Sequence, residues 1–167
     1  PPRHVLAFPA QSNFDGTLYP LRAWLAQCDH AAAHTHVLLD AAAYVPTHAL
    51  DVGALRPSFV TLSFYKMFGT PTGLGALLVR ADVAKHLRAP YWAGGTVVSA
   101  LTDVDYEVLR DTTHERYEFG TVHFLGILAL RYGFDALDNV HFERAARHAH
   151  ALAAHLAARL ARLRHAA

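Results

Sequence analysis

The first half of the chain alternates short apolar runs with segments whose apolar residues recur at helical spacing. Four of the runs are short, mostly apolar and bounded by turn-forming residues, and the third of them is also rich in β-branched and aromatic residues, a pattern that predicts strands. These runs are Val5 to Phe8, His36 to Asp40, Phe59 to Ser63 and Ala76 to Arg80. Continuous hydrophobicity, without alternation, is typical of strands buried on both faces of a mainly parallel sheet.

Helices are predicted between and after these strands. Pro20 suits the entry to the first helix, and Asp82 can cap a later one. Near Gly133 we expect an interruption, because glycine weakens a helix interior. The predicted helical segments are Leu21 to Cys28, Leu50 to Leu55, Asp82 to about Leu87, Val122 to Leu137 and Val140 to Leu163. Leucines at 152, 156, 160 and 163 form one stripe of the last segment.

The stretch from Ala89 to Gly120 is predicted to be mostly irregular, with small polar nodes at Gly94-Gly95-Thr96 and Phe119-Gly120-Thr121. Elsewhere strands alternate with helices. This order predicts an α/β domain, a three-layer sandwich built on a mainly parallel sheet.

Composition adds several exclusions. With 167 residues, 53% of them hydrophobic and only 17% charged, the chain fits one ordered domain. The net charge is +1, and the arginines of the last segment are spaced as on a solvated helix face, so we expect no nucleic-acid partner. Every apolar stretch falls well short of the roughly 20 residues that span a bilayer, so no membrane partner is expected either.

The cysteine and histidine residues indicate neither an internal disulfide nor a metal site. Cys28 is the only cysteine and cannot form an internal disulfide, so a reducing, cytoplasmic compartment is expected. Its place in a helical segment indicates a core thiol. The 13 histidines follow no tight ligand spacing, and no metal site is predicted.

Two ionisable residues lie where α/β sheets bind ligands, beyond the carboxyl ends of the strands: Asp40, which closes the second strand, and Lys66, which is expected in the loop after the third. The residues on both sides of Lys66 are apolar or aromatic. They would shield its amine from water, which favours a role as a nucleophile. Together, Asp40 and Lys66 are the two groups that pyridoxal phosphate requires, a lysine that binds its aldehyde and a carboxylate that keeps its ring nitrogen protonated. A solvated surface lysine and a carboxylate that caps the next turn remain the alternatives.

The amino-acid sequences of several segments resemble those of the molybdenum cofactor sulfurases, which belong to the class V aminotransferase branch of fold-type I pyridoxal phosphate enzymes. The most specific segment surrounds Lys66. The matching segments are Pro9 to Phe14, Val37 to Ala42, Leu62 to Gly75, Gly94 to Val97, Tyr117 to Thr121 and Leu130 to Asp135.

This resemblance implies a site residue by residue. Lys66 matches the Schiff-base lysine, and Asp40 matches the partner of the pyridine nitrogen. Asn13 stands where this class has an asparagine near the phenolic oxygen of the cofactor. Ser63 matches a phosphate-binding hydroxyl, and Thr96 resembles the residue that reaches the phosphate of the neighbouring subunit's cofactor.

Departures from the related cysteine desulfurases are also visible. Ala43 stands in place of a cofactor-contacting glutamine, and Tyr65 in place of a histidine. The main phosphate-cradling loop, the substrate-carboxylate arginine and the persulfide-forming cysteine are expected outside this chain. The resemblance thus implies a partial large domain of a fold-type I transferase, with residues 1–138 forming the sheet and cofactor-site region and residues 139–167 a long helix leading toward a small domain.

The implied function is a pyridoxal phosphate-dependent reaction of the cysteine desulfurase type. L-Cysteine is the substrate, the molybdenum cofactor is the sulfur acceptor through parts outside this chain, and the full-length enzyme is a homodimer. Two alternatives stay open. One is another class V activity, such as a transaminase, epimerase or lyase; the other is a non-catalytic gene fragment.

Overall fold

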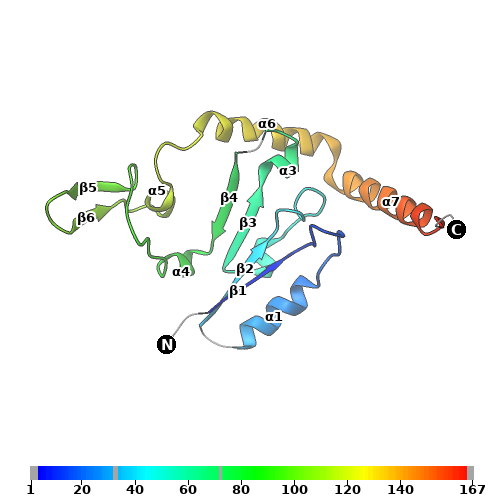
Figure 1. Cartoon of the computed structure of the whole chain (residues 1–167), viewed down its shortest axis with the longest axis horizontal. Coiled ribbons are helices and arrows are strands. Elements are labelled where there is room, and N and C mark those ends of the chain that lie inside the picture. Colours follow the sequence, from blue (N-terminus) through cyan, green and yellow to red (C-terminus); the bar gives the residue numbers. More distant parts are fainter. Residues whose placement is uncertain (1–3, 32–33, 72, 165–167) are drawn as a thin grey trace.

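A four-stranded sheet forms the centre of the computed structural model, which describes residues 4–31, 34–71 and 73–164 (Figure 1). The strand order follows the chain. The strands are β1 (His4–Pro9), β2 (Thr35–Asp40), β3 (Phe59–Ser63) and β4 (Gly75–Val79). The first three are parallel and β4 is antiparallel to β3, so the predicted α/β class and mainly parallel sheet are confirmed.

One face of the sheet carries the core under α1 (Leu21–Ala31). Leu21 and Leu25 of this helix pack with Val37, Leu39 and Val60, all less than 8% exposed. Because successive side chains of a strand point to opposite faces, the strand residues next to Val37, Leu39 and Val60 point away from α1. The helix begins as predicted, with the Pro20 carbonyl accepting a hydrogen bond from the Trp24 amide at 3.1 Å.

Both edge strands differ from the expectation of full burial. In β1, Val5 is 60% exposed, and in β4, Leu77 is 54% exposed. Continuous apolar runs therefore mark all four strands correctly, but only β2 and β3 have a hydrogen-bonded strand on each side.

The predicted irregular stretch contains a hairpin and a short helix. Strands β5 (Val97–Leu101) and β6 (Tyr106–Leu109) pair antiparallel, and α5 (Thr113–Tyr117) follows. The turn formers from Thr102 to Asp105 between two β-rich runs were the available signal. Much of the stretch is irregular as predicted, but the hairpin was missed because its strands are short and mostly exposed, so their hydrophobicity has no clear period.

Two short helices flank β3. One is α2 (Val52–Leu55), where Asp51 caps the first turn by accepting from the Ala54 amide at 2.9 Å. The other is α3 (Phe64–Phe68), which follows β3 directly. Lys66 was expected in a loop and lies instead within this single helical turn. Thr72, in the segment that joins α3 to β4, lies outside the described residues.

A further short helix, α4 (Ala81–Ala84), follows β4. Arg80, not Asp82, occupies its N-cap position, and the predicted cap was wrong. Asp82 lies in the first turn, where the Nε of Arg80 donates to its carboxylate at 2.6 Å. This contact lowers the pKa of Asp82 below its ordinary value.

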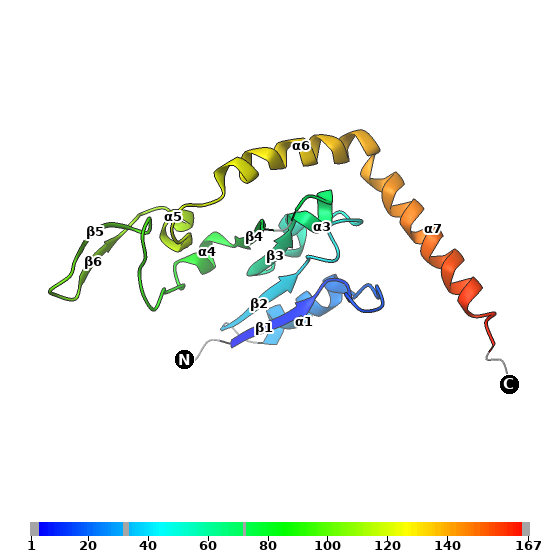
Figure 2. The ribbon, with the colours of Figure 1, turned by 45° about the horizontal axis from the view of Figure 1, so that its top comes forward.

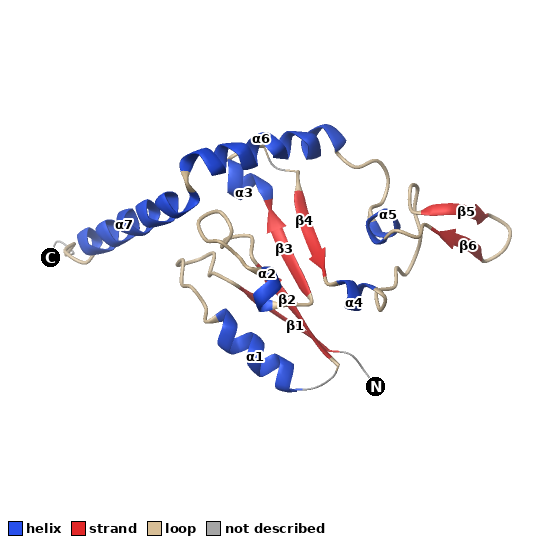
Figure 3. Cartoon of the chain, turned by 180° about the vertical axis from the view of Figure 1, so that it is seen from behind, coloured by secondary structure: helices blue, strands red, loops and turns tan. Residues whose placement is uncertain are grey.

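The last third of the chain forms α6 (Phe124–Val140) and α7 (Phe142–Leu160). The expected interruption at Gly133 was wrong, because α6 is continuous there. The break lies at His141, whose positive φ of 56° ends α6 and begins α7. Figure 2 shows α6 beside α3, with α7 projecting away from the sheet. Figure 3 shows α7 and the β5–β6 hairpin at opposite ends of the molecule.

Among the described helices, none combines the length and the hydrophobicity that crossing a membrane requires.

Candidate functional site

Four of the five predicted site residues lie at one edge of the sheet. Asn13 follows β1, Asp40 ends β2, Ser63 ends β3 and Lys66 lies in α3, immediately beyond β3. Parallel strands bring their carboxyl ends to the same edge, which is where open α/β sheets bind ligands. The sheet topology, not proximity in sequence, brings these groups together.

The backbone around Asp40 is held by the strands on both sides. Its carbonyl accepts from the Ala10 amide at 2.7 Å, and the next amide, Ala41, donates to the Thr61 carbonyl at 3.1 Å. The side chain is exposed, and its Oδ1 accepts from the Ala42 amide at 3.0 Å and from the Thr61 hydroxyl at 3.2 Å. Among the described residues, Oδ2 has no hydrogen-bond partner.

Lys66 donates from Nζ to Oδ1 of Asn13 at 2.9 Å. The lysine is half-buried and Asn13 is exposed. No direct hydrogen bond or ion pair joins Lys66 to Asp40 within the described part of the chain. The amine is thus held by a neutral acceptor and is not neutralised by a carboxylate.

A compact turn presents Asn13. The Ser12 hydroxyl accepts from the amides of Phe14 and Asp15 at 3.2 and 3.3 Å, and the Asp15 carboxylate accepts from the Thr17 amide at 3.0 Å. Gly16 supplies the positive φ of 75° that lets the chain return. The hydrogen bond between the Ser12 and Asp15 side chains, together with the Thr17 amide, lowers the pKa of Asp15 below its ordinary value.

Packing against α6 fixes the helical turn that carries Lys66. The ring of Phe68 lies on Gly133, where a Cβ atom would come within 2.6 Å of ring carbons. Phe134 of α6 meets Phe68 edge-on, with ring centroids 5.0 Å apart. Gly69 then ends α3 with a positive φ of 67°. The lysine backbone therefore depends on a close approach of two helices that only glycine at 133 permits.

Ser63 occupies the N-cap position of α3, but its hydroxyl makes no capping bond. It has no hydrogen-bond partner among the described residues and is half-buried. This hydroxyl is free to bind a ligand at the sheet edge.

Thr96 is not brought together with the other four. It is fully buried, and its hydroxyl donates to the Ala93 carbonyl at 2.7 Å and accepts from the Ala93 amide at 3.2 Å. Nearby, the Gly120 amide donates to the Gly94 carbonyl at 2.7 Å, so the two predicted polar nodes do meet each other.

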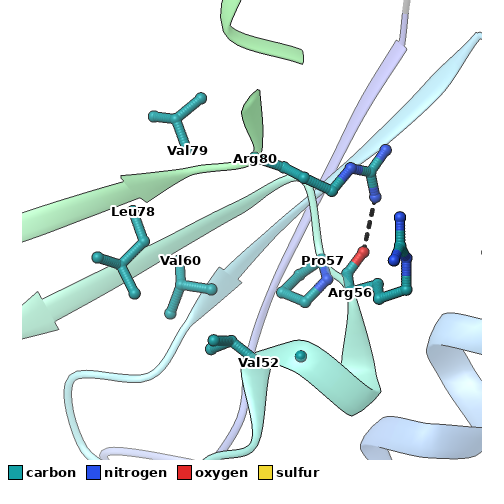
Figure 4. Close-up of a pocket in the computed structure, with 8 residues that line it drawn as sticks. Val52, Arg56, Pro57, Val60, Leu78, Val79 and Arg80 are labelled. Carbon is teal, nitrogen blue, oxygen red and sulfur yellow. Dashed lines mark hydrogen bonds between the residues drawn. The ribbon is translucent and has the colours of Figure 1, made fainter. Parts of the chain in front are cut away.

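A cavity of about 260 Å³ lies near the other ends of β3 and β4 (Figure 4). Pro57 and Arg80 border it, and the Arg80 side chain donates to the Arg56 carbonyl at 2.7 Å. Its lining includes none of the predicted site residues. Within the described residues, no group of three or more histidine, cysteine or acidic side chains could hold a metal ion.

The sequence analysis did not identify two residues that support the candidate site, namely Thr61, which donates to Asp40, and Ser12, which holds the turn that presents Asn13. Thr61 is the register partner of Asp40 on the next strand, so its signal was the alignment of β2 with β3. Ser12 had a weaker signal in the turn-forming run that follows β1.

Comparison with known proteins is consistent with this architecture. The chain is 46% identical over 146 residues to the molybdenum cofactor sulfurase of Bos taurus, covering 83% of this chain and 16% of that protein. It is 42% identical over 177 residues to molybdenum cofactor sulfurase 2 of Culex quinquefasciatus, covering 97% of this chain and 23% of that protein. The chain thus spans less than a quarter of the length of these relatives.

The fold is similar to that of a cysteine desulfurase from Thermococcus onnurineus NA1. The TM-score is 0.71 at 23% identity, over 84% of this chain and 34% of that one. The expected fold, part of a fold-type I large domain, is confirmed. The family model described as aminotransferase class-V matches residues 1–167. On these grounds the chain belongs to the class V aminotransferase family.

Proposed function

We propose that this chain is the central part of the catalytic domain of a molybdenum cofactor sulfurase. The proposed reaction is a pyridoxal phosphate-dependent desulfuration of L-cysteine that supplies sulfur to the molybdenum cofactor. The observation that carries the proposal is the hydrogen bond from Lys66 to Asn13 at the sheet edge where Asp40 ends β2. The sequence identity to molybdenum cofactor sulfurases is the reason for proposing this reaction among those of the class V family.

The chemistry of the donor set fits pyridoxal phosphate. Lys66 offers a primary amine for the aldehyde, Asp40 a carboxylate oxygen for the ring nitrogen, and Asn13 an amide for the phenolic oxygen. The Ser63 hydroxyl is available to a phosphate oxygen. When bound, the cofactor would withdraw electrons from the substrate α-carbon.

The residues of the chain would then divide the remaining work. Asp40 would hold the proton on the ring nitrogen, and Asn13 would orient the ring. Lys66, once replaced by substrate as the group bound to the cofactor, would move protons between the substrate carbons. The products would be alanine, which is released, and a persulfide on an enzyme thiol that has accepted the sulfur of L-cysteine.

Cys28 does not suit the sulfur-accepting role. It is half-buried and packs against the core beneath the sheet, on the α1 side. A thiolate nucleophile needs exposure and a polar environment. We therefore place the accepting cysteine in another part of the whole protein, together with the substrate-carboxylate arginine.

We also propose that the whole enzyme is a cytoplasmic homodimer in which Thr96 reaches the partner's cofactor phosphate. A phosphate oxygen needs a donor, and the Thr96 proton is directed at the Ala93 carbonyl. That role therefore requires the hydroxyl to turn away from Ala93 in the dimer. Residues 1–138 would form the cofactor-site region and residues 139–167 the helix that leads toward the small domain.

The test is an assay of the purified whole protein with pyridoxal phosphate and L-cysteine. Alanine and enzyme persulfide should form in equal amounts, be lost in Lys66→Ala and persist in Lys85→Ala, because Lys85 is exposed after α4. Formation of a keto acid or of D-cysteine would favour a transaminase or an epimerase. Absence of any lysine-dependent product would favour a non-catalytic fragment.

A further inference from the structure

We propose that Thr61 is a positioning residue for Asp40. Its hydroxyl holds Oδ1 of the carboxylate and so leaves Oδ2 as the oxygen for the cofactor's ring nitrogen. This inference rests on the proposed function, because it assigns a role within the same cofactor site.

The sheet register places Thr61 beside Asp40. The two residues are direct partners in the parallel pairing of β2 with β3. Side chains of directly paired residues project from the same face of a sheet. Val60, the preceding residue, is 2% exposed in the core on the opposite face. Thr61 and Asp40 therefore share the face that is not covered by α1.

Two donors from different segments meet on one carboxylate oxygen. The Ala42 amide and the Thr61 hydroxyl both donate to Oδ1, at 3.0 and 3.2 Å. Within the described residues Oδ2 accepts nothing, and the Asp40 side chain is exposed. A single amide would leave the carboxylate free to rotate in water. The second donor, from the neighbouring strand, fixes its plane.

Threonine suits this task because its β-branched side chain has few χ1 rotamers on a strand. The backbone contributes as well, since the Thr61 carbonyl accepts from the Ala41 amide at 3.1 Å. Thr61 thus contacts both sides of the Asp40–Ala41 peptide, with its carbonyl on the Ala41 amide and its hydroxyl on the Asp40 carboxylate. Loss of the hydroxyl would remove only the side-chain contact.

The experiment compares Thr61→Val with Thr61→Ser in the whole protein. Thr35→Val is the matched control, because Thr35 begins β2 at the opposite edge of the sheet and its hydroxyl has no partner among the described residues. Each variant is titrated with pyridoxal phosphate, and the pH at which the visible absorption of the bound cofactor changes is measured. Cysteine turnover gives kcat and KM separately.

Thr61→Val should bind the cofactor, shift that pH in the same direction as Asp40→Ala, and lower kcat about tenfold with KM changed less than about twofold. Thr35→Val should match the wild type. Thr61→Ser keeps the hydroxyl but loses the methyl group that restricts χ1, so it should lie between the wild type and Thr61→Val. In the Asp40→Ala background, Thr61→Val should cause no further shift, because the hydroxyl then has no carboxylate to hold. If Thr61→Val does not fold, Thr61→Ala takes its place in every comparison.

A Thr61→Val protein that titrates like Thr35→Val would overturn the inference while leaving the proposed function intact. An equal shift in the Asp40→Ala background would also overturn it, because the effect would then bypass Asp40. A wild-type protein that binds no pyridoxal phosphate would refute the proposed function, and the positioning role with it.

Discussion

The Nζ atom of Lys66 lies 2.9 Å from Oδ1 of Asn13, although the two residues are 53 positions apart in the chain. The contact joins the turn after β1 to the helical turn after β3, across the carboxyl end of β2. It holds the amine at the sheet edge where Asp40 ends β2, and within the described part of the chain no ion pair joins the two side chains.

Lys66 should be the residue that holds pyridoxal phosphate covalently. Lys85, the other lysine of the chain, is exposed just after α4 and has no comparable polar partner among the described residues. Borohydride reduction of the cofactor-loaded whole protein, followed by peptide mapping, should place the label on Lys66. A label on Lys85 would contradict the assignment.

Asp40→Asn should keep the cofactor but lose turnover by about 10- to 100-fold. An amide can still accept from Ala42 and Thr61, yet it carries no charge to hold a proton on the ring nitrogen. Cofactor content measured by absorbance and alanine release measured from cysteine separate these effects. Turnover like that of the wild type would show that Asp40 only caps the turn at the end of β2.

The turn that presents Asn13 should loosen at low pH. Because the pKa of Asp15 is lowered in the folded chain, its ionised form stabilises the turn above the ordinary pKa of an aspartate. That contribution is lost as the pH falls through the lowered pKa. Ser12→Ala removes the largest cause of the shift, so the Asp15 pKa should rise toward its ordinary value in a carboxyl NMR titration. An unchanged pKa would show that Ser12 does not hold this carboxylate.

Gly133→Ala should destabilise the protein although alanine favours helices. The new methyl group would collide with the Phe68 ring, and overpacking of this kind outweighs the gain in helix propensity, for a net loss on the order of 1 kcal/mol. Denaturant unfolding measures the change.

Phe68→Ala provides the matched background for that experiment. Without the ring, Gly133→Ala should become stabilising by about 0.5–1 kcal/mol, because only the helix preference remains. The same loss in both backgrounds would show that the contact between α3 and α6 is not its cause.

Local sequence patterns predicted most elements of this fold. Apolar runs with β-branched residues located all four strands of the sheet to within a residue or so, because strand propensity and burial act on neighbouring positions. Helical spacing located α1, α6 and α7. It failed at Gly133, because a glycine that lowers helix propensity can still be required by a ring packed against it. The short β5–β6 hairpin had no hydrophobic period strong enough to reveal it.

The candidate site was defined by the sequence and the tertiary structure together. The sequence by itself determined the residue types, a lysine and a carboxylate after buried strands, together with the family resemblance that linked Asn13, Ser63 and Thr96 to them. The tertiary structure alone decided that Asn13 holds Lys66, that Thr61 holds Asp40 and that the Thr96 hydroxyl is bound to Ala93. Such contacts join residues far apart in the chain or on different strands. Strand register, helix packing and the path of each turn select them, and no local pattern of hydrophobic and polar residues encodes those choices.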